Sequence, residues 1–125
     1  VRKRLALLTS DAYRHLFAGL LCTIDLGNDP VTTYEALLEF APPSVDFLLP
    51  HGNWGTPPPA WSAEDAPYGE SLIKVFDRWY DAPYRPGVGF RDRSVYCADL
   101  YRLISHVKNR FGADYEAHLA SQAGR

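Results

Sequence analysis

Polar and aromatic side chains with binding potential follow two apolar segments of this chain, where the segments end: Asp25, Asn28, His51, Asn53 and Trp54. The segments are residues 16–24 and 45–49. If both are parallel strands of one sheet, their carboxyl ends meet at one edge, where α/β proteins bind ligands. At this edge, the carboxylate, amide, imidazole and indole groups of these residues would contact a polar ligand. Turn formation is the competing interpretation for the first two residues, and a structured loop is the competing interpretation for the other three.

The elements that would position these side chains form one βαβ unit. Residues 16–24 are almost uninterrupted apolar, as in a strand covered on both faces, although a buried helix is the rival interpretation of so short a run. Asp29 is a suitable N-cap and Pro30 a suitable first helical residue, so a helix is predicted over residues 30–40. Two prolines end it. Residues 45–49 then predict a second strand, parallel to the first and beside it.

The C-terminal part of the chain predicts two more helices. The first begins at Pro67 and ends before Pro83. Residues 84–93 hold two glycines and a proline among charged residues and predict a linker. The second helix is predicted over residues 94–111, with Ser94 as its cap and Gly112 as its stop. We expect the chain to self-associate unless the apolar stripe of this helix folds back across the open face of the sheet: Leu100, Ile104, Val107 and Phe111.

The order of these elements and their residues resemble a known family. The run LFAGLLCTIDLGNDPVTTYEALLEFAPPSVDFLLPHGNW, followed by PPPAW and then PYGESLIKVFDRWYD, is similar to the middle of the catalytic barrel of radical S-adenosylmethionine peptide maturases. The most similar branch is the FxsB-like enzymes with a SPASM domain, which install cyclophane crosslinks in ribosomally made peptides. The resemblance covers roughly the first two thirds of the chain, to about Asp81.

The resemblance implies an α/β fold: a partial (β/α) barrel with one βαβ unit of parallel strands and additional C-terminal helices. Residues 1–83 would be the barrel segment, and residues 84–125 a linker and helical extension. The intact enzyme would use S-adenosylmethionine and a [4Fe–4S] cluster to abstract hydrogen from a precursor peptide. The region that borders the cofactor and peptide would include the residues named at the start: Asp25, Asn28, His51, Asn53 and Trp54.

The cysteines depart from the family pattern. Members hold their cluster with a CxxxCxxC loop, whereas Cys22 and Cys97 are the only cysteines here, and the family's glycine-rich segment is missing as well. A cluster needs three or four grouped thiolates. We therefore expect no cofactor and no catalytic residue in this chain alone, which we interpret as an inactive fragment. Both cysteines are predicted to pack as small apolar side chains, and the four histidines lack metal-ligand spacing.

The amino-acid composition argues against two classes of protein, those that bind nucleic acids and those that span a membrane. A net charge of −2 argues against a nucleic-acid surface, and no apolar run approaches the ~20 residues of a membrane span. Two distant cysteines favour a reducing compartment, so we expect a cytoplasmic protein that self-associates through open strand edges. Two alternatives stay open. One is a non-enzymatic interaction domain using helix 94–111, and the other is a small α/β enzyme in which His51 pairs with Asp25 or Glu64 as general base.

Overall fold

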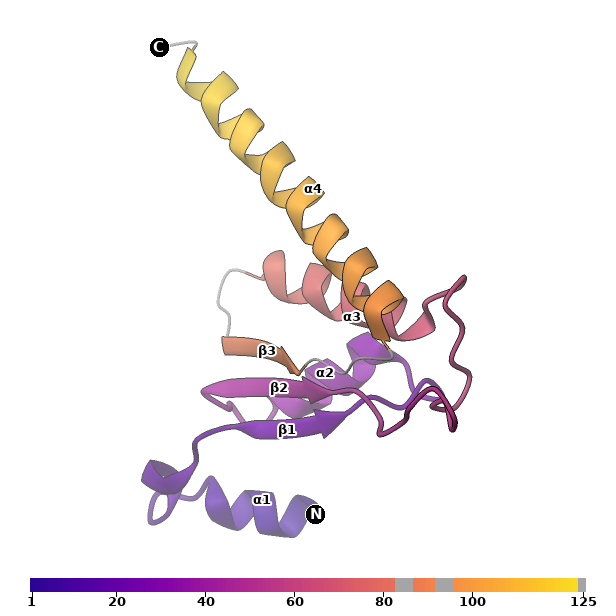
Figure 1. Ribbon diagram of the computed structural model, residues 1–125. Helices are drawn as coiled ribbons and strands as arrows, with labels where there is room; N and C mark the ends of the chain where they lie inside the picture. Colours follow the sequence, from indigo (N-terminus) through magenta and orange to yellow (C-terminus); the bar gives the residue numbers. More distant parts are fainter. Residues whose placement is uncertain (83–86, 92–95, 124–125) are drawn as a thin grey trace.

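The computed structural model describes residues 1–82, 87–91 and 96–123. The chain has an α/β fold in which helices and strands alternate (Figure 1). In chain order the elements are α1 (Arg2–Leu8), the 3₁₀ turn η1 (Arg14–Leu16), β1 (Leu20–Thr23), α2 (Pro30–Leu38), β2 (Ser44–Leu48), α3 (Pro67–Tyr80), β3 (Gly87–Arg91) and α4 (Cys97–Ala123).

The strands form a parallel sheet in the order β1-β2-β3. The predicted parallel pairing of the first two strands is confirmed, with Leu20 opposite Val45, although β1 is shorter than the predicted run 16–24. Asp29 caps α2 as predicted, accepting a 2.8 Å hydrogen bond from the backbone N–H of Thr32. Helix α3 begins at Pro67, also as predicted.

The prediction of a linker over residues 84–93 is wrong for residues 87–91, because they form β3, which pairs with β2 along its whole length. Residues 84–86 and 92–93 lie outside the described residues. Glycine and proline lower the strand propensity of such a segment, so its local sequence is typical of a loop. Pairing with β2 overrides this preference. The backbone N–H of Gly87 also donates to the carbonyl oxygen of Pro43 at 3.1 Å. The chain therefore contains two consecutive βαβ units, where one was expected.

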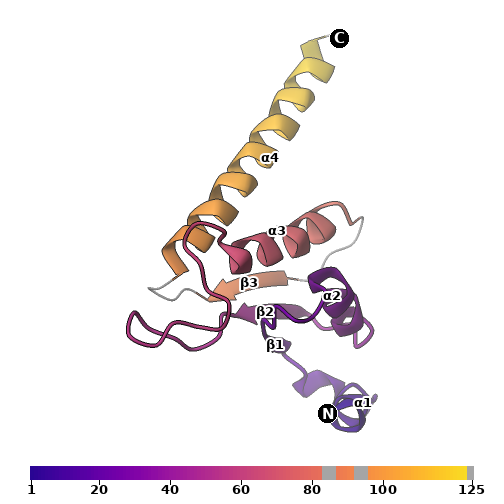
Figure 2. The same cartoon turned by 90° about the vertical axis from the view of Figure 1, so that its right-hand side faces the viewer.

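Helices α2 and α3 pack against each other and lie on the same side of the sheet (Figure 2). The side chains of β2 alternate accordingly: Val45 and Phe47 are buried in the core, while their neighbours are only partly buried. Leu21 of β1 is on the other face and is 63% exposed. The prediction that the first strand is covered on both faces is therefore wrong. No helix in the described parts of the chain covers this second face.

The contact between α3 and α4 explains why that face stays open. Asp99 of α4 is fully buried, and its Oδ1 accepts a 2.9 Å hydrogen bond from the backbone N–H of Gly69 in the first turn of α3. The residue at the N-cap of α3, Ala66, offers no side-chain hydrogen bond, so the carboxylate supplies a cap from another helix. A Cβ on Gly69 would lie 2.6 Å from the carbonyl oxygen of Asp99. Helix α4 is thus held on α3, so the alternative in which its stripe covers the open face of the sheet is not realised in the described structure.

Helix α4 is also longer than predicted. It continues through Gly112 to Ala123, and its second half extends away from the body of the molecule (Figure 1). The position of a Cβ at Gly112 has no neighbour within 4 Å, so this glycine costs the helix only about 1 kcal/mol of propensity and does not end it. Ser94, the predicted cap, lies outside the described residues. Among the described helices, none combines the length and apolar character needed to cross a membrane.

Two buried tyrosines form hydrogen bonds with the long loop between β2 and α3. The Tyr68 hydroxyl donates to the carbonyl oxygen of Pro59, and the Tyr96 hydroxyl to that of Pro50, both at 2.6 Å. Their rings meet edge to face at 5.2 Å inside the core. At the far end of the loop, Arg102 of α4 donates to the carbonyl oxygen of Asp65 at 2.6 Å. The loop is therefore attached to the core at several points.

We expect Asp99→Ala to lower the free energy of unfolding by about 1–2 kcal/mol, because the buried N–H of Gly69 loses its acceptor and α3 loses its cap. Urea unfolding of both proteins measures this. The matched control is Asp11→Ala, since Asp11 is an exposed aspartate without an ion pair in the described chain. If Asp99→Ala unfolds at the same urea concentration as the unchanged protein, the capping role is wrong.

A charged cluster also joins α3 to α4. Burial acts to raise the pKa of Asp77, but hydrogen bonds from His106 and Arg110, each at 2.7 Å, outweigh it and lower that pKa. A depressed carboxyl pKa stabilises the fold at pH values above the ordinary aspartate range. This stabilisation is lost as pH falls through the folded-state pKa.

We therefore expect Asp77→Asn to destabilise the protein near neutral pH, and we expect this effect to shrink as the pH falls below the ordinary aspartate range and through the lowered pKa of Asp77. Thermal melts of the two proteins across this range measure the difference. A loss of stability that is the same at every pH would contradict the assignment, because it would reflect packing and not charge.

Candidate functional site

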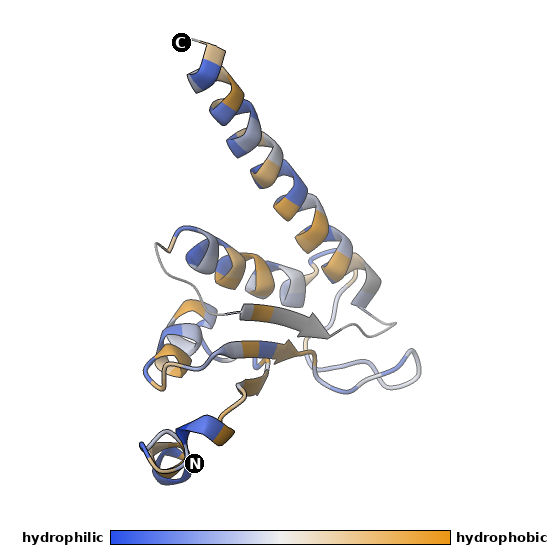
Figure 3. Cartoon of the chain, turned by 90° about the vertical axis from the view of Figure 1, so that its left-hand side faces the viewer, coloured by the Kyte–Doolittle hydropathy of each residue, from blue (hydrophilic) through white to orange (hydrophobic). Residues whose placement is uncertain are grey.

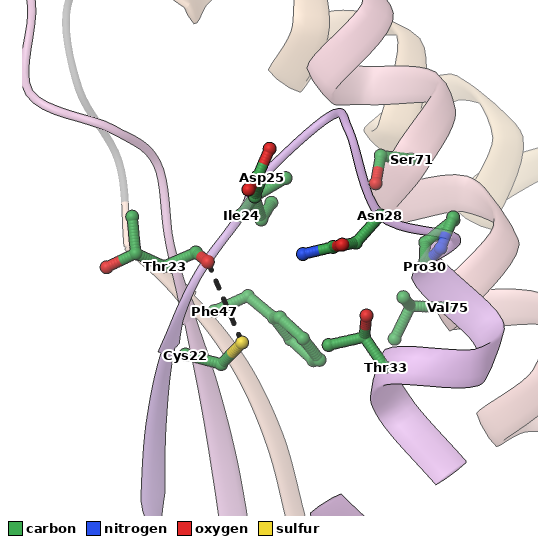
Figure 4. Close-up of a pocket in the computed structure, with 10 residues that line it drawn as sticks. All are labelled: Cys22, Thr23, Ile24, Asp25, Asn28, Pro30, Thr33, Phe47, Ser71 and Val75. Atoms are coloured by element: carbon green, nitrogen blue, oxygen red, sulfur yellow. Dashed lines mark hydrogen bonds between the residues drawn. The ribbon is translucent and has the colours of Figure 1, made fainter. Parts of the chain in front are cut away.

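A small pocket of about 100 Å³ opens at the carboxyl end of β1, between the sheet, α2 and α3 (Figure 4). Its apolar wall is formed by the side chains of Cys22, Ile24, Phe47 and Val75. Its polar lining residues are Asp25, Asn28, Thr33 and Ser71. The pocket thus lies at the edge of the sheet where parallel α/β proteins place their ligands.

The loop between β1 and α2 positions the polar residues of this pocket. Oδ1 of Asp25 accepts a 2.8 Å hydrogen bond from the backbone N–H of Gly27, and the carbonyl oxygen of Asp25 accepts one from the N–H of Asn28. The loop is therefore a tight turn, and one oxygen of the Asp25 carboxylate already accepts a hydrogen bond within it. The side-chain amide of Asn28 points toward the pocket (Figure 4) and has no hydrogen-bond partner among the described residues. Asn28 is thus the group most available to a ligand.

The predicted site residues separate into two groups. Asp25 and Asn28 line the pocket, whereas His51, Asn53 and Trp54 lie in the long loop that follows β2 and are exposed. Oδ1 of Asn53 accepts hydrogen bonds from the backbone N–H groups of the next turn at 2.8 and 2.9 Å. The Trp54 ring meets Trp61 edge-on at 5.8 Å and is 69% exposed. The loop group is therefore near the same end of the sheet but outside the pocket.

Among the lining residues that were not predicted for the site, Thr33, Ser71 and Cys22 carry groups with binding potential. Thr33 and Ser71 come from the middle of α2 and the first turns of α3, and no local motif marks them. Cys22 was predicted as a core residue, but it is only half-buried and its sulfur lies beside the pocket (Figure 4). Burial raises the pKa of the Cys22 thiol. The thiol is therefore protonated near neutral pH and is a weak nucleophile.

A second cleft of about 290 Å³ adjoins the pocket and shares Asn28, Pro30 and Ser71 with it. The cleft is lined by charged side chains of both signs: Asp65, Glu70 and Lys74. Glu70 already forms a 2.9 Å ion pair with Arg102. Pocket and cleft together suit a ligand with a small neutral end and a polar or charged end.

Within the described ranges, the pocket and the cleft offer binding groups, but the predicted acid–base pair is not formed. His51 forms no hydrogen bond or ion pair with Asp25 or Glu64, so the predicted general-base pair is not assembled in the described structure. In the described ranges no three His, Cys, Asp or Glu side chains gather closely enough to hold a metal ion.

Comparison with known proteins does not assign a family. The chain matches no protein-family model, no curated protein and no solved structure.

We expect Cys22 to react slowly with iodoacetamide near neutral pH and faster as the pH rises through its raised pKa. The measurement uses Cys97→Ser, so that Cys22 is the only thiol, with the urea-unfolded protein as the control. If the folded protein reacts as fast as the unfolded one, the Cys22 thiol is not shielded from solvent and its pKa is not raised.

Proposed function

We propose that this chain is a segment of the (β/α) barrel of a radical S-adenosylmethionine peptide maturase, in which it supplies wall and carboxyl-end loops. The resemblance of residues 16–81 to such enzymes supports the family. The observation that carries the barrel is the order β1-β2-β3, with α2 and α3 on one side of the sheet (Figure 2).

The described strands show no reversal of order, as a barrel requires, and one half of a doubly wound sheet has the same order. A doubly wound sheet reverses its strand order and has helices on both faces, whereas a (β/α) barrel adds each strand beside the last and keeps all helices outside. In a barrel the open face, which carries the exposed Leu21, would face the interior. The carboxyl-end loops would then surround the mouth of the barrel.

The residues of this chain fit only part of such a site. A pocket of about 100 Å³ is smaller than the roughly 300 Å³ or more of a typical small-molecule site, so it would hold one end of a ligand, with the amide of Asn28 and the hydroxyl of Ser71 as hydrogen-bonding groups. The iron–sulfur cluster does not fit this chain, because a cluster needs three grouped thiolates and the chain has two cysteines in all. Other units of the barrel would have to bind it.

A second candidate is the non-enzymatic interaction domain. One observation favours it: the projecting half of α4 has exposed apolar side chains, among them Phe111 at 65%. Such a helix face is a common site of protein association. The partner that fits this face is derived below.

The open reading frame around this chain tests the barrel proposal. We expect it to encode a CxxxCxxC loop upstream, and we expect the corresponding longer protein, reconstituted anaerobically, to cleave S-adenosylmethionine to 5′-deoxyadenosine. Asn28→Ala should lower kcat/KM about tenfold through one lost hydrogen bond, and Asn109→Ala, an exposed asparagine of α4, should not.

The isolated chain is the control for this experiment, because two cysteines should leave it without a cluster after reconstitution. A reading frame with a start codon and no related units upstream would overturn the proposal. So would a stoichiometric cluster in the isolated chain.

A further inference from the structure

Beyond its first two turns, α4 carries exposed apolar side chains on one face that the described chain leaves largely uncovered. We call this face the α4 stripe; it consists of Ile104, Phe111, Tyr115 and Leu119. Their exposure ranges from 48% for Leu119 to 65% for Phe111. Steps of seven, four and four residues keep them on one side of a helix. Apolar positions recur along the projecting part of the helix in Figure 3.

The α4 stripe begins at an apolar groove. This groove, of about 450 Å³, lies between α3, β3 and α4, and Phe76, Trp79 and Val107 contribute to its walls. Ile104 belongs to both the groove and the stripe, and Lys108 lines the groove beside it. A helix laid along the stripe would therefore also cover the groove.

Two side chains of opposite charge lie near the stripe and form no ion pair within the described structure. Lys108 and Asp114 have no ion-pair partner among the described residues, whereas the arginines of α4 are engaged: Arg102 with Glu70 and Arg110 with Asp77. The free charges lie on opposite sides of Phe111 along the helix, the basic one toward the body and the acidic one toward the tip. They would attract a helix that runs in the opposite direction with the same sequence.

The stripe is complementary to itself in that antiparallel arrangement. With Phe111 at a two-fold axis, Ile104 lies opposite Leu119 of the second copy, because the two residues are nearly equally far from the axis. Val107 then lies opposite Tyr115 of the second copy, and Lys108 lies opposite its Asp114, because the members of each pair are equally far from Phe111. Gly112, beside the axis, has open space where a Cβ would be, which allows the two helices to approach closely.

We propose that the α4 stripe pairs with the α4 stripe of a second copy, antiparallel and with the two-fold axis at Phe111. The same surface then serves both subunits, as in isologous dimers. The apolar pair Val107 and Tyr115 and the charged pair Lys108 and Asp114 each match across this two-fold axis, which favours a second copy over a different partner. The 27-residue helix is about 40 Å long, which gives the second copy a contact well beyond the part held on α3. The inference identifies a partner for the interaction surface and does not depend on the barrel proposal.

Sedimentation equilibrium of the chain from micromolar to millimolar concentrations tests the pairing. We expect a monomer–dimer equilibrium, and Phe111→Glu should raise the dissociation constant about a hundredfold, because each of the two copies contributes one tenfold loss. The control is Leu7→Glu on α1, where the leucine is 61% exposed and lies away from the stripe. It should leave the dissociation constant unchanged. Circular dichroism of both variants confirms that they are folded.

A charge exchange tests the register. Lys108→Glu and Asp114→Lys should each weaken the dimer, and the double variant should restore it, because the exchanged charges meet again only if the helices are antiparallel about Phe111. A chain that stays monomeric throughout overturns the proposal. Equal effects of Phe111→Glu and Leu7→Glu, or a double variant that stays weak, would also overturn it. None of these outcomes bears on 5′-deoxyadenosine formation by the longer protein.

Discussion

The contact between the Asp99 carboxylate and the first turn of α3 determines the arrangement of both long helices. It requires a glycine at position 69, because the backbone of α4 occupies the space of a Cβ there. The other oxygen of the carboxylate, Oδ2, is buried without a partner within the described structure, which is costly. A polar group buried at such cost constrains where α4 can dock. An apolar residue at the same position would allow α4 to slide along α3.

This constraint has consequences for both faces of the sheet. Since α4 packs on α3, the core lies on one side of the sheet and is closed by Leu72, Val75 and Leu103. The second face is left open, with Leu21 exposed. The direction of α4 from its anchor also carries its second half away from the body, and Phe111 remains 65% exposed. One buried carboxylate thus accounts for both the helix-free face and the uncovered helix.

The parts that the sequence predicts correctly are those determined by neighbouring residues. Asp29 and Pro30 start α2 through a local hydrogen bond and a fixed φ angle, so the β1-α2-β2 unit follows from them. Asp25 and Asn28 are in the pocket because the strand that ends just before them fixes their place. By contrast, β3 depends on pairing with a strand some forty residues earlier, and its own glycines favour a loop. Ser71 reaches the pocket only through the packing of α3, which no local pattern reveals.

The protein has two candidate binding surfaces, the pocket and the apolar groove. The pocket lies at the end of β1, the strand at one edge of the sheet, and the apolar groove lies beside β3, the strand at the other edge. The groups that line them differ in kind, with an amide and hydroxyls at the pocket and aromatic and aliphatic side chains at the groove. Helix α3 contributes Ser71 and Val75 to the first and Phe76 and Trp79 to the second. A ligand at the pocket and a second copy at the groove would therefore contact different sides of one helix, and α3 is the element through which occupancy of one could affect the other.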